Sequence, residues 1–178
     1  TIAVNHLAPF LLTNLLLDRL RASASAPGAS GPGRIVTVAS QAHRGARLDL
    51  RTWMGPEGWT PLQAYGRSKL CNILFTRALA RRLADSNVVA ASLHPGVIAT
   101  KIAESAGSVV GFGWRLAKPF MASPEKGART SVYLATSDEV ANVSGKLFAN
   151  CKQAKTSGQS EDPAVADKLY ELSKQMVG

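Results

Sequence analysis

Apolar residues recur at helical spacing in two segments of the chain. In residues 5–21 leucines and a phenylalanine fall three or four positions apart, and similar spacing returns in 62–85, which predicts a helix in each segment. The segment 123–136 is typical of a capped helix, because Ser123 precedes a proline as an N-cap residue does. A last amphipathic helix is predicted at 163–177.

Three short apolar runs lie between these helices, at 34–40, 87–96 and 144–150. Runs of this length that are bounded by turn residues are typical of buried strands. Strands that alternate with helices favour parallel pairing through crossover helices, which is the α/β layered class. Three strands make a thin sheet for this class and leave a strand edge uncovered.

The segments between these elements differ in character. Residues 22–33, "ASASAPGASGPG", form a connector whose glycines imitate a dinucleotide-binding loop. They precede a strand instead of joining a strand to a helix, so we reject that interpretation. A long loop is predicted for 41–61 and a partly apolar insertion for 97–125.

Composition narrows the function classes. The chain of 178 residues has the length of one domain, and its formal charge is +9. Lysines and arginines are dispersed, without a long basic run or interleaved aromatic residues, so no nucleic-acid partner is expected and the basic surface is read as solvated. The cysteines and histidines are scattered in the sequence, which predicts no metal site and favours a reducing, intracellular compartment.

A tyrosine and a lysine four positions apart, Tyr65 and Lys69, stand near the start of the predicted helix 62–85. Residues at this spacing are neighbours on one helix face. An ammonium held near a phenol favours the phenolate, so such a pair can act as a general acid and base near neutral pH. The same spacing also arises by chance on a solvated helix face, and the pair alone does not decide between the two.

Candidate ligand-binding residues follow two predicted strands. Ser40 ends the run 34–40, and Pro95 and Gly96 end the run 87–96. Ligands of open α/β sheets bind beyond the carboxyl ends of the strands. A serine there can donate a hydrogen bond to a substrate carbonyl oxygen and stabilise developing negative charge. The alternative is an ordinary turn residue.

The first predicted helix contains Pro9 four residues after Asn5. Proline has no N–H to donate to the Asn5 carbonyl, which would leave that oxygen free to hold a water beside Lys69. In the competing interpretation Pro9 only occupies the first helical turn and Asn5 is a cap.

Four motifs in this order, "VNHLAPFLLTNLL", "RIVTVAS", "YGRSK" and "HPGVIATK", resemble the short-chain dehydrogenase/reductase family. The resemblance is to its retinol-dehydrogenase-like and protochlorophyllide-reductase-like members, including the plant chloroplast-translocon-associated type, and covers nearly the whole chain. It implies a single partial domain over 1–178, with a Rossmann-like parallel sheet and flanking helices but without the family's N-terminal strands and Gly-rich turn. It also implies hydride transfer between a nicotinamide cofactor and an alcohol or carbonyl group.

The resemblance assigns a role to each candidate residue. Tyr65 would be the general acid/base, Lys69 would activate it and bind the nicotinamide ribose, Ser40 would orient the substrate oxygen, and Asn5 would hold a relay water through its main chain. The implied cofactor-binding residues are Tyr65, Lys69, Pro95, Gly96, Ile98 and Thr100.

The implied cofactor is NADP, with NAD as the alternative, because the residues that distinguish them belong to the half without a counterpart here. Segment 97–125 corresponds to a substrate lid, whose aromatic residues indicate an apolar substrate or, equally, packing within the lid. The family also implies a homodimer contact through helix 62–85, and the stretch 106–122 is compatible with contact to a membrane surface. A chloroplast location would apply only to a plant protein. The alternative function is a non-catalytic fragment or partner-binding remnant of such an enzyme.

Overall fold

A four-stranded sheet forms the centre of the protein in the computed structural model, which describes residues 1–55, 60–96, 123–156 and 158–178. The strand order is β1-β2-β3-β4, and the first three strands are parallel. The α/β class with flanking helices is thereby confirmed. The strands are β1 (Gly33–Val38), β2 (Val88–Leu93), β3 (Leu147–Ala149) and β4 (Lys152–Gln153).

The prediction of a single strand at 144–150 is wrong in its extent. The chain turns at Asn150 and Cys151, whose φ angles are 49° and 58°, and β4 returns antiparallel to β3. Two consecutive residues with positive φ are what a two-residue hairpin of the I′ type requires. The sequence lacks the Asn-Gly pair that usually announces such a turn, which is why the fourth strand was missed.

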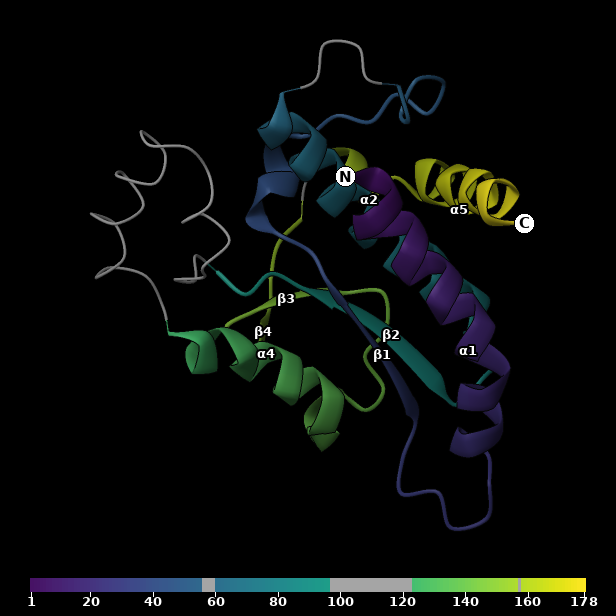
Figure 1. Cartoon of the computed structure of the whole chain (residues 1–178). Coiled ribbons are helices and arrows are strands. Elements are labelled where there is room, and N and C mark those ends of the chain that lie inside the picture. Colours follow the sequence, from purple (N-terminus) through teal and green to yellow (C-terminus); the bar gives the residue numbers. More distant parts are fainter. Residues whose placement is uncertain (56–59, 97–122, 157) are drawn as a thin grey trace.

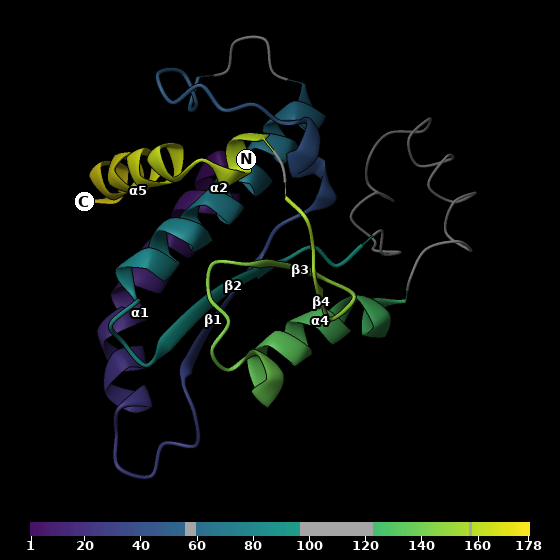
Figure 2. The same cartoon turned by 180° about the vertical axis from the view of Figure 1, so that it is seen from behind.

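Helices cover both faces of the sheet. In Figure 1, α4 lies on one side of the strands while α1 and α2 lie on the other, and Figure 2 shows the same layers from behind. Helix α5 packs against α2 and α1. The helices are α1 (Ala8–Ala24), α2 (Pro61–Arg82), α4 (Pro124–Thr136) and α5 (Pro163–Val177), joined by the short helices η1 (Ala3–Leu7), η2 (Gln41–Gly45), η5 (Asp138–Val140) and η6 (Gly158–Glu161).

Side-chain hydrogen bonds explain where three of these helices begin. Ser123 accepts from the Lys126 N–H and caps α4 as predicted. Thr60 and Gln63 form a reciprocal capping box at the start of α2, and Asp162 accepts from two N–H groups of α5. Each cap satisfies backbone donors that have no partner within the helix.

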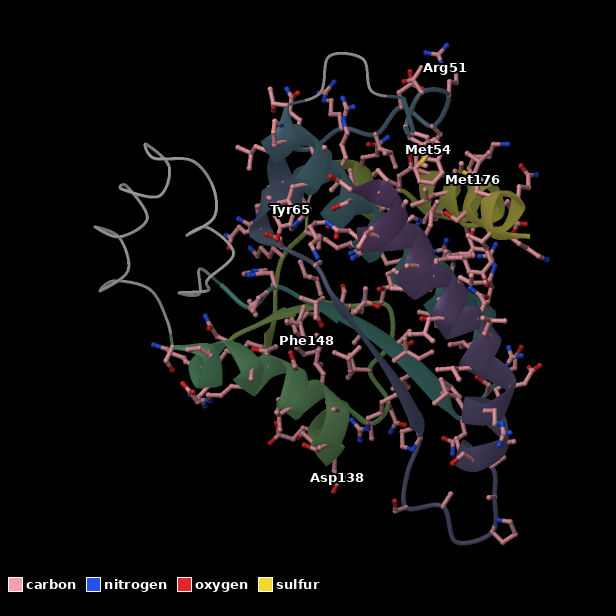
Figure 3. The ribbon with its side chains drawn as sticks, in the orientation of Figure 1. Arg51, Met54, Tyr65, Asp138, Phe148 and Met176 are labelled. Carbon is pink, nitrogen blue, oxygen red and sulfur yellow. The ribbon has the colours of Figure 1, made fainter. Side chains whose placement is uncertain are left out.

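Strand β2 carries apolar side chains on both faces because both faces are covered. Val88 and Ala90 belong to the cluster under α1, α2 and α5, whereas Ala91 and Leu93 belong to the cluster under α4. Alternate residues of β2 thus pack into the two hydrophobic clusters on opposite faces of the sheet. In Figure 3, Phe148 of β3 lies between the sheet and α4, where its ring is 6.4 Å from that of Tyr133.

Two segments differ from their predicted form. The helix predicted at 5–21 starts with the single π-helical turn η1, in which the Ala8 N–H bonds the Ala3 carbonyl. The loop predicted at 41–61 includes η2, and its Trp53 is buried against the ring of His6. Among the described residues no helix is both long and apolar enough to cross a membrane.

Candidate active site

Helix α2 presents Tyr65 and Lys69 on one face, as their spacing predicts. The Lys69 ammonium nitrogen lies 5.5 Å from the centre of the Tyr65 ring. Tyr65 is 38% exposed, so part of this residue is open to solvent. Figure 3 shows Tyr65 close to the chain that leaves β1.

Lys69 is held by the end of β1. Its Nζ donates to the Val38 carbonyl at 3.1 Å, and the Asn72 amide nitrogen donates to the same oxygen at 3.2 Å. Burial lowers the pKa of Lys69 from its ordinary value, because the charged ammonium loses hydration there. A long side chain that is usually mobile is therefore fixed at the rim of the sheet.

Ser40 lies two residues beyond β1 and caps η2, so the expectation that it ends the strand is wrong by those two residues. Its hydroxyl oxygen accepts from the Ala42 N–H at 3.3 Å. The His43 ring donates from Nδ1 to the Ser40 carbonyl at 2.6 Å, which holds the turn from the other side. A hydroxyl that accepts from the backbone keeps its O–H hydrogen for donation to a ligand oxygen.

Gly66 allows the turn that carries Ser40 to lie directly against α2. A Cβ at position 66 would be 2.8 Å from the Ala42 carbonyl oxygen, closer than real Cβ atoms approach backbone oxygen. Only glycine permits this approach without a shift of backbone. The residue next to Tyr65 in "YGRSK" thus helps to bring two predicted site residues to one place, a role that the sequence interpretation missed.

Asn5 is tied to the turn of α2 that carries Tyr65. Its Nδ2 donates to the Ser68 hydroxyl at 3.0 Å, and that hydroxyl donates to the Tyr65 carbonyl at 2.7 Å. The interpretation of Asn5 as a helix cap is wrong, because Ile2 and Leu7 occupy the N-cap positions. π-Helical turns are frequent at functional sites, and here one holds Asn5.

Pro95 and Gly96 leave the same rim as Ser40. Val38 pairs with Leu93 in the sheet, so Ser40 and Pro95 each lie two residues past a paired position. Gly96 has a φ of +81°, a conformation that residues with a Cβ rarely adopt, and a Cβ there would meet no atom of the described residues within 4 Å. Ile98, Thr100 and nearly all of the predicted lid lie outside the described residues.

Two histidines that look isolated in the sequence are neighbours of the site. Burial lowers the pKa of His43 and of His94, and the charge of His43 lowers that of His94 further. Within the described ranges, no group of three or more His, Cys, Asp or Glu side chains is placed to hold a metal ion. Only the fold brings these two rings near each other, so no local motif could have paired them.

Comparison with known proteins agrees with the geometry. The family model described as short chain dehydrogenase matches residues 1–111. The chain belongs to the short-chain dehydrogenase family. Among curated relatives, human retinol dehydrogenase 14 is 40% identical over 98% of this chain and 51% of its own length, and mouse retinol dehydrogenase 12 is 38% identical over 98% and 53%. The chain thus spans about half the length of the curated relatives it matches.

Solved structures of dehydrogenases and related proteins share the fold. An uncharacterised protein from Mycobacterium paratuberculosis superposes with a TM-score of 0.70 at 30% identity, covering 98% of this chain and 57% of that one. A proposed NAD(P)-dependent gluconate 5-dehydrogenase from Beutenbergia cavernae, with bound NADP, gives a TM-score of 0.58 at 27% identity, covering 84% and 53%. The four-stranded sheet is therefore a partial short-chain dehydrogenase fold relative to these chains.

Proposed function

We propose that this chain supplies the acid–base part of the active site of an oxidoreductase that interconverts an alcohol and a carbonyl group with a nicotinamide cofactor. The observation that carries the proposal is the contact between Tyr65 and a Lys69 side chain fixed at the end of β1. Membership of the short-chain dehydrogenase family supports it.

The described residues fit the nicotinamide half of such a cofactor. Lys69 offers ammonium donors to ribose hydroxyls, and Gly96 adds no side chain at the same rim. When bound, the cofactor supplies or accepts the hydride. The Gly-rich turn that binds pyrophosphate in the family has no counterpart in this sequence. NADP is the proposed cofactor, with NAD as the alternative.

The chain's own residues handle the proton and the substrate oxygen. In the reductive direction, Tyr65 donates its phenolic proton to the carbonyl oxygen as the alcohol forms, and the Ser40 hydroxyl donates a hydrogen bond to the same oxygen. The Lys69 ammonium favours the phenolate that remains. The proposed role of Asn5 is to hold a relay water through its main chain, while its side chain secures the Tyr65 turn.

The names of the relatives indicate an apolar alcohol or aldehyde as the substrate, because the curated relatives described above are retinol dehydrogenases. The predicted lid would supply the apolar contacts. Likeness to the protochlorophyllide-reductase and chloroplast-translocon type, a chloroplast location, contact with a membrane surface and a homodimer stay predictions. Light scattering of the purified chain would decide the last of these.

Replacement of Tyr65 with phenylalanine tests the proposal in the protein at the full length of its relatives. Turnover of an apolar alcohol or aldehyde should fall by at least about a hundredfold, the contribution expected of a general acid/base, while cofactor affinity is retained. Tyr133→Phe is the matched control, since the Tyr133 hydroxyl contacts only Glu139 among the described residues. Wild-type turnover in Tyr65→Phe would exclude this role.

A second proposed function is a non-catalytic fragment or partner-binding remnant. The observation behind it is that the family's Gly-rich pyrophosphate-binding turn has no counterpart in these 178 residues. Titration of the 178-residue chain with NADPH, followed by cofactor fluorescence, separates the two. Saturable binding that is lost in Lys69→Met would support the enzyme, whereas absence of binding would support the remnant for this polypeptide.

A further inference from the structure

A line of polar groups runs from the half-buried Lys69, at the rim of the sheet, into the buried centre of the protein. It passes from the Lys69 ammonium to the Val38 carbonyl, then to the side chains of Asn72, His6 and Ser173, and we refer to these five groups as the buried polar chain. Asn72, His6 and Ser173 are 3%, 1% and 0% exposed. Burial at this level makes an unsatisfied polar atom costly, so the donors and acceptors must match.

The orientation of the Asn72 amide follows from Val38. A carbonyl oxygen only accepts hydrogen bonds, so the Asn72 nitrogen faces Val38 and the Asn72 oxygen points away. That oxygen, Oδ1, has no hydrogen-bond partner among the described residues, and neither has Nδ1 of His6. Both atoms are buried, and the His6 ring lies 6.1 Å from the ring of Phe75, which follows Asn72 by about one turn of α2. Burial lowers the His6 pKa to about 4, and the Asn72 side chain partly opposes this effect. A hydrogen bond between the two unpartnered atoms is the pairing that would satisfy both.

One tautomer of His6 satisfies every member of the buried polar chain. With its hydrogen on Nδ1, His6 presents a donor for the Asn72 oxygen, and its bare Nε2 accepts from the Ser173 hydroxyl, which lies 2.8 Å away. The other tautomer would set a lone pair of Nδ1 against the Asn72 oxygen. Rotating the amide to relieve that contact would set its oxygen against the Val38 carbonyl instead.

We propose that His6 and Asn72 are positioning residues that hold the Lys69 ammonium where the Tyr65 phenol needs it. Asn72 fixes the Val38 carbonyl on which Lys69 rests, His6 fixes the amide of Asn72, and Ser173 of α5 anchors His6. The catalytic meaning of this arrangement rests on the proposed function, but the arrangement itself does not. It makes the final helix a support for the active-site lysine, although His6 and Ser173 are 167 positions apart.

The test uses nuclear magnetic resonance of the 178-residue chain, with the ring nitrogens of His6 and the titration of Lys69 as readouts. At neutral pH, His6 should carry its hydrogen on Nδ1 and none on Nε2, the reverse of the tautomer that imidazole favours in water. In Asn72→Ala, His6 should change to the Nε2-protonated form, which can still donate to Ser173. The Lys69 pKa should rise toward its ordinary value, because water enters beside it and the Val38 carbonyl loses its second donor.

Tyr170→Phe is the matched control. It removes a hydroxyl from the same helix as Ser173, one that donates to Asn14 at 2.6 Å outside the buried polar chain. It should leave both the His6 tautomer and the Lys69 titration unchanged. Wild-type His6 protonated on Nε2, or an Asn72→Ala protein whose Lys69 titrates as in the wild type, would overturn the proposal. Neither readout needs turnover, so failure of the proposed function would be recognised separately, by active Tyr65→Phe.

Discussion

Replacement of Gly66 with alanine tests the close approach of α2 to the turn that carries Ser40. The new Cβ would lie 2.8 Å from the Ala42 carbonyl oxygen and 3.5 Å from the Ala46 Cβ. A backbone oxygen cannot swing aside as a flexible side chain can, so η2 and α2 must separate by several tenths of an ångström.

Two effects of opposite sign determine how Gly66→Ala changes the free energy of unfolding. Alanine is a better helix former than glycine by about 1 kcal/mol, whereas overpacking costs about 1–3 kcal/mol. We expect Gly66→Ala to lose about 1 kcal/mol net, which for a chain of this length lowers Tm by about 2–4 °C. Turnover of the full-length protein should fall as well, because the same shift moves Ser40 away from Tyr65.

Urea and thermal unfolding of Gly66→Ala and Gly45→Ala provide the assay. Gly45 lies in the neighbouring η2, and a Cβ there would meet no atom of the described residues within 4 Å. The Gly45 variant should therefore unfold like the wild type. If Gly66→Ala were about 1 kcal/mol more stable than the wild type, helix propensity alone would be acting and the steric reasoning would be refuted.

Two further predictions concern buried titratable groups. Burial holds the His6 pKa at about 4 in the folded protein, against an ordinary 6.5 in the unfolded chain. The unfolded chain therefore binds a proton more readily below pH 6.5, and the free energy of unfolding should fall by about 3 kcal/mol between pH 6.5 and pH 4. Urea midpoints should accordingly decline more steeply over this range in the wild type than in His6→Leu. Burial also raises the pKa of the Cys71 thiol, while Cys151 is partly exposed. A thiol reagent at neutral pH should therefore label Cys151 in the folded protein and Cys71 only after denaturation, and rapid labelling of both would contradict the buried position.

Several elements were predictable because their signals are local. The helix predicted at 163–177 is observed as Pro163–Val177, and Ser123 caps α4 where expected. Caps and apolar spacing act over one or two turns, so a short window of sequence contains them. The fourth strand was missed because the turn pairs Asn150, which adopts positive φ readily, with Cys151, a residue type that rarely does, in place of the usual glycine.

The residues of the candidate site likewise divide into those that the sequence predicted and those that only the structure revealed. Tyr65 and Lys69 share a helix face at a spacing that the sequence shows directly, and the order of elements predicts that Ser40 and Pro95 lie near the carboxyl ends of two strands. The roles assigned to these residues stay predictions, and Ile98 and Thr100 lie outside the described residues. Gly66 belongs to the recognised motif "YGRSK", but only the structure shows that the Ala42 carbonyl lies against it and leaves no space for a Cβ.

The sequence by itself therefore determined the α/β class, the main helices and the pair on α2, because periodicity and capping are properties of neighbouring residues. Tertiary structure alone decided what holds that pair. Lys69 meets the Val38 carbonyl across 31 positions, and His6 meets Ser173 across 167. Such contacts arise because distant polar groups are buried together and must satisfy one another, a condition that no local pattern expresses.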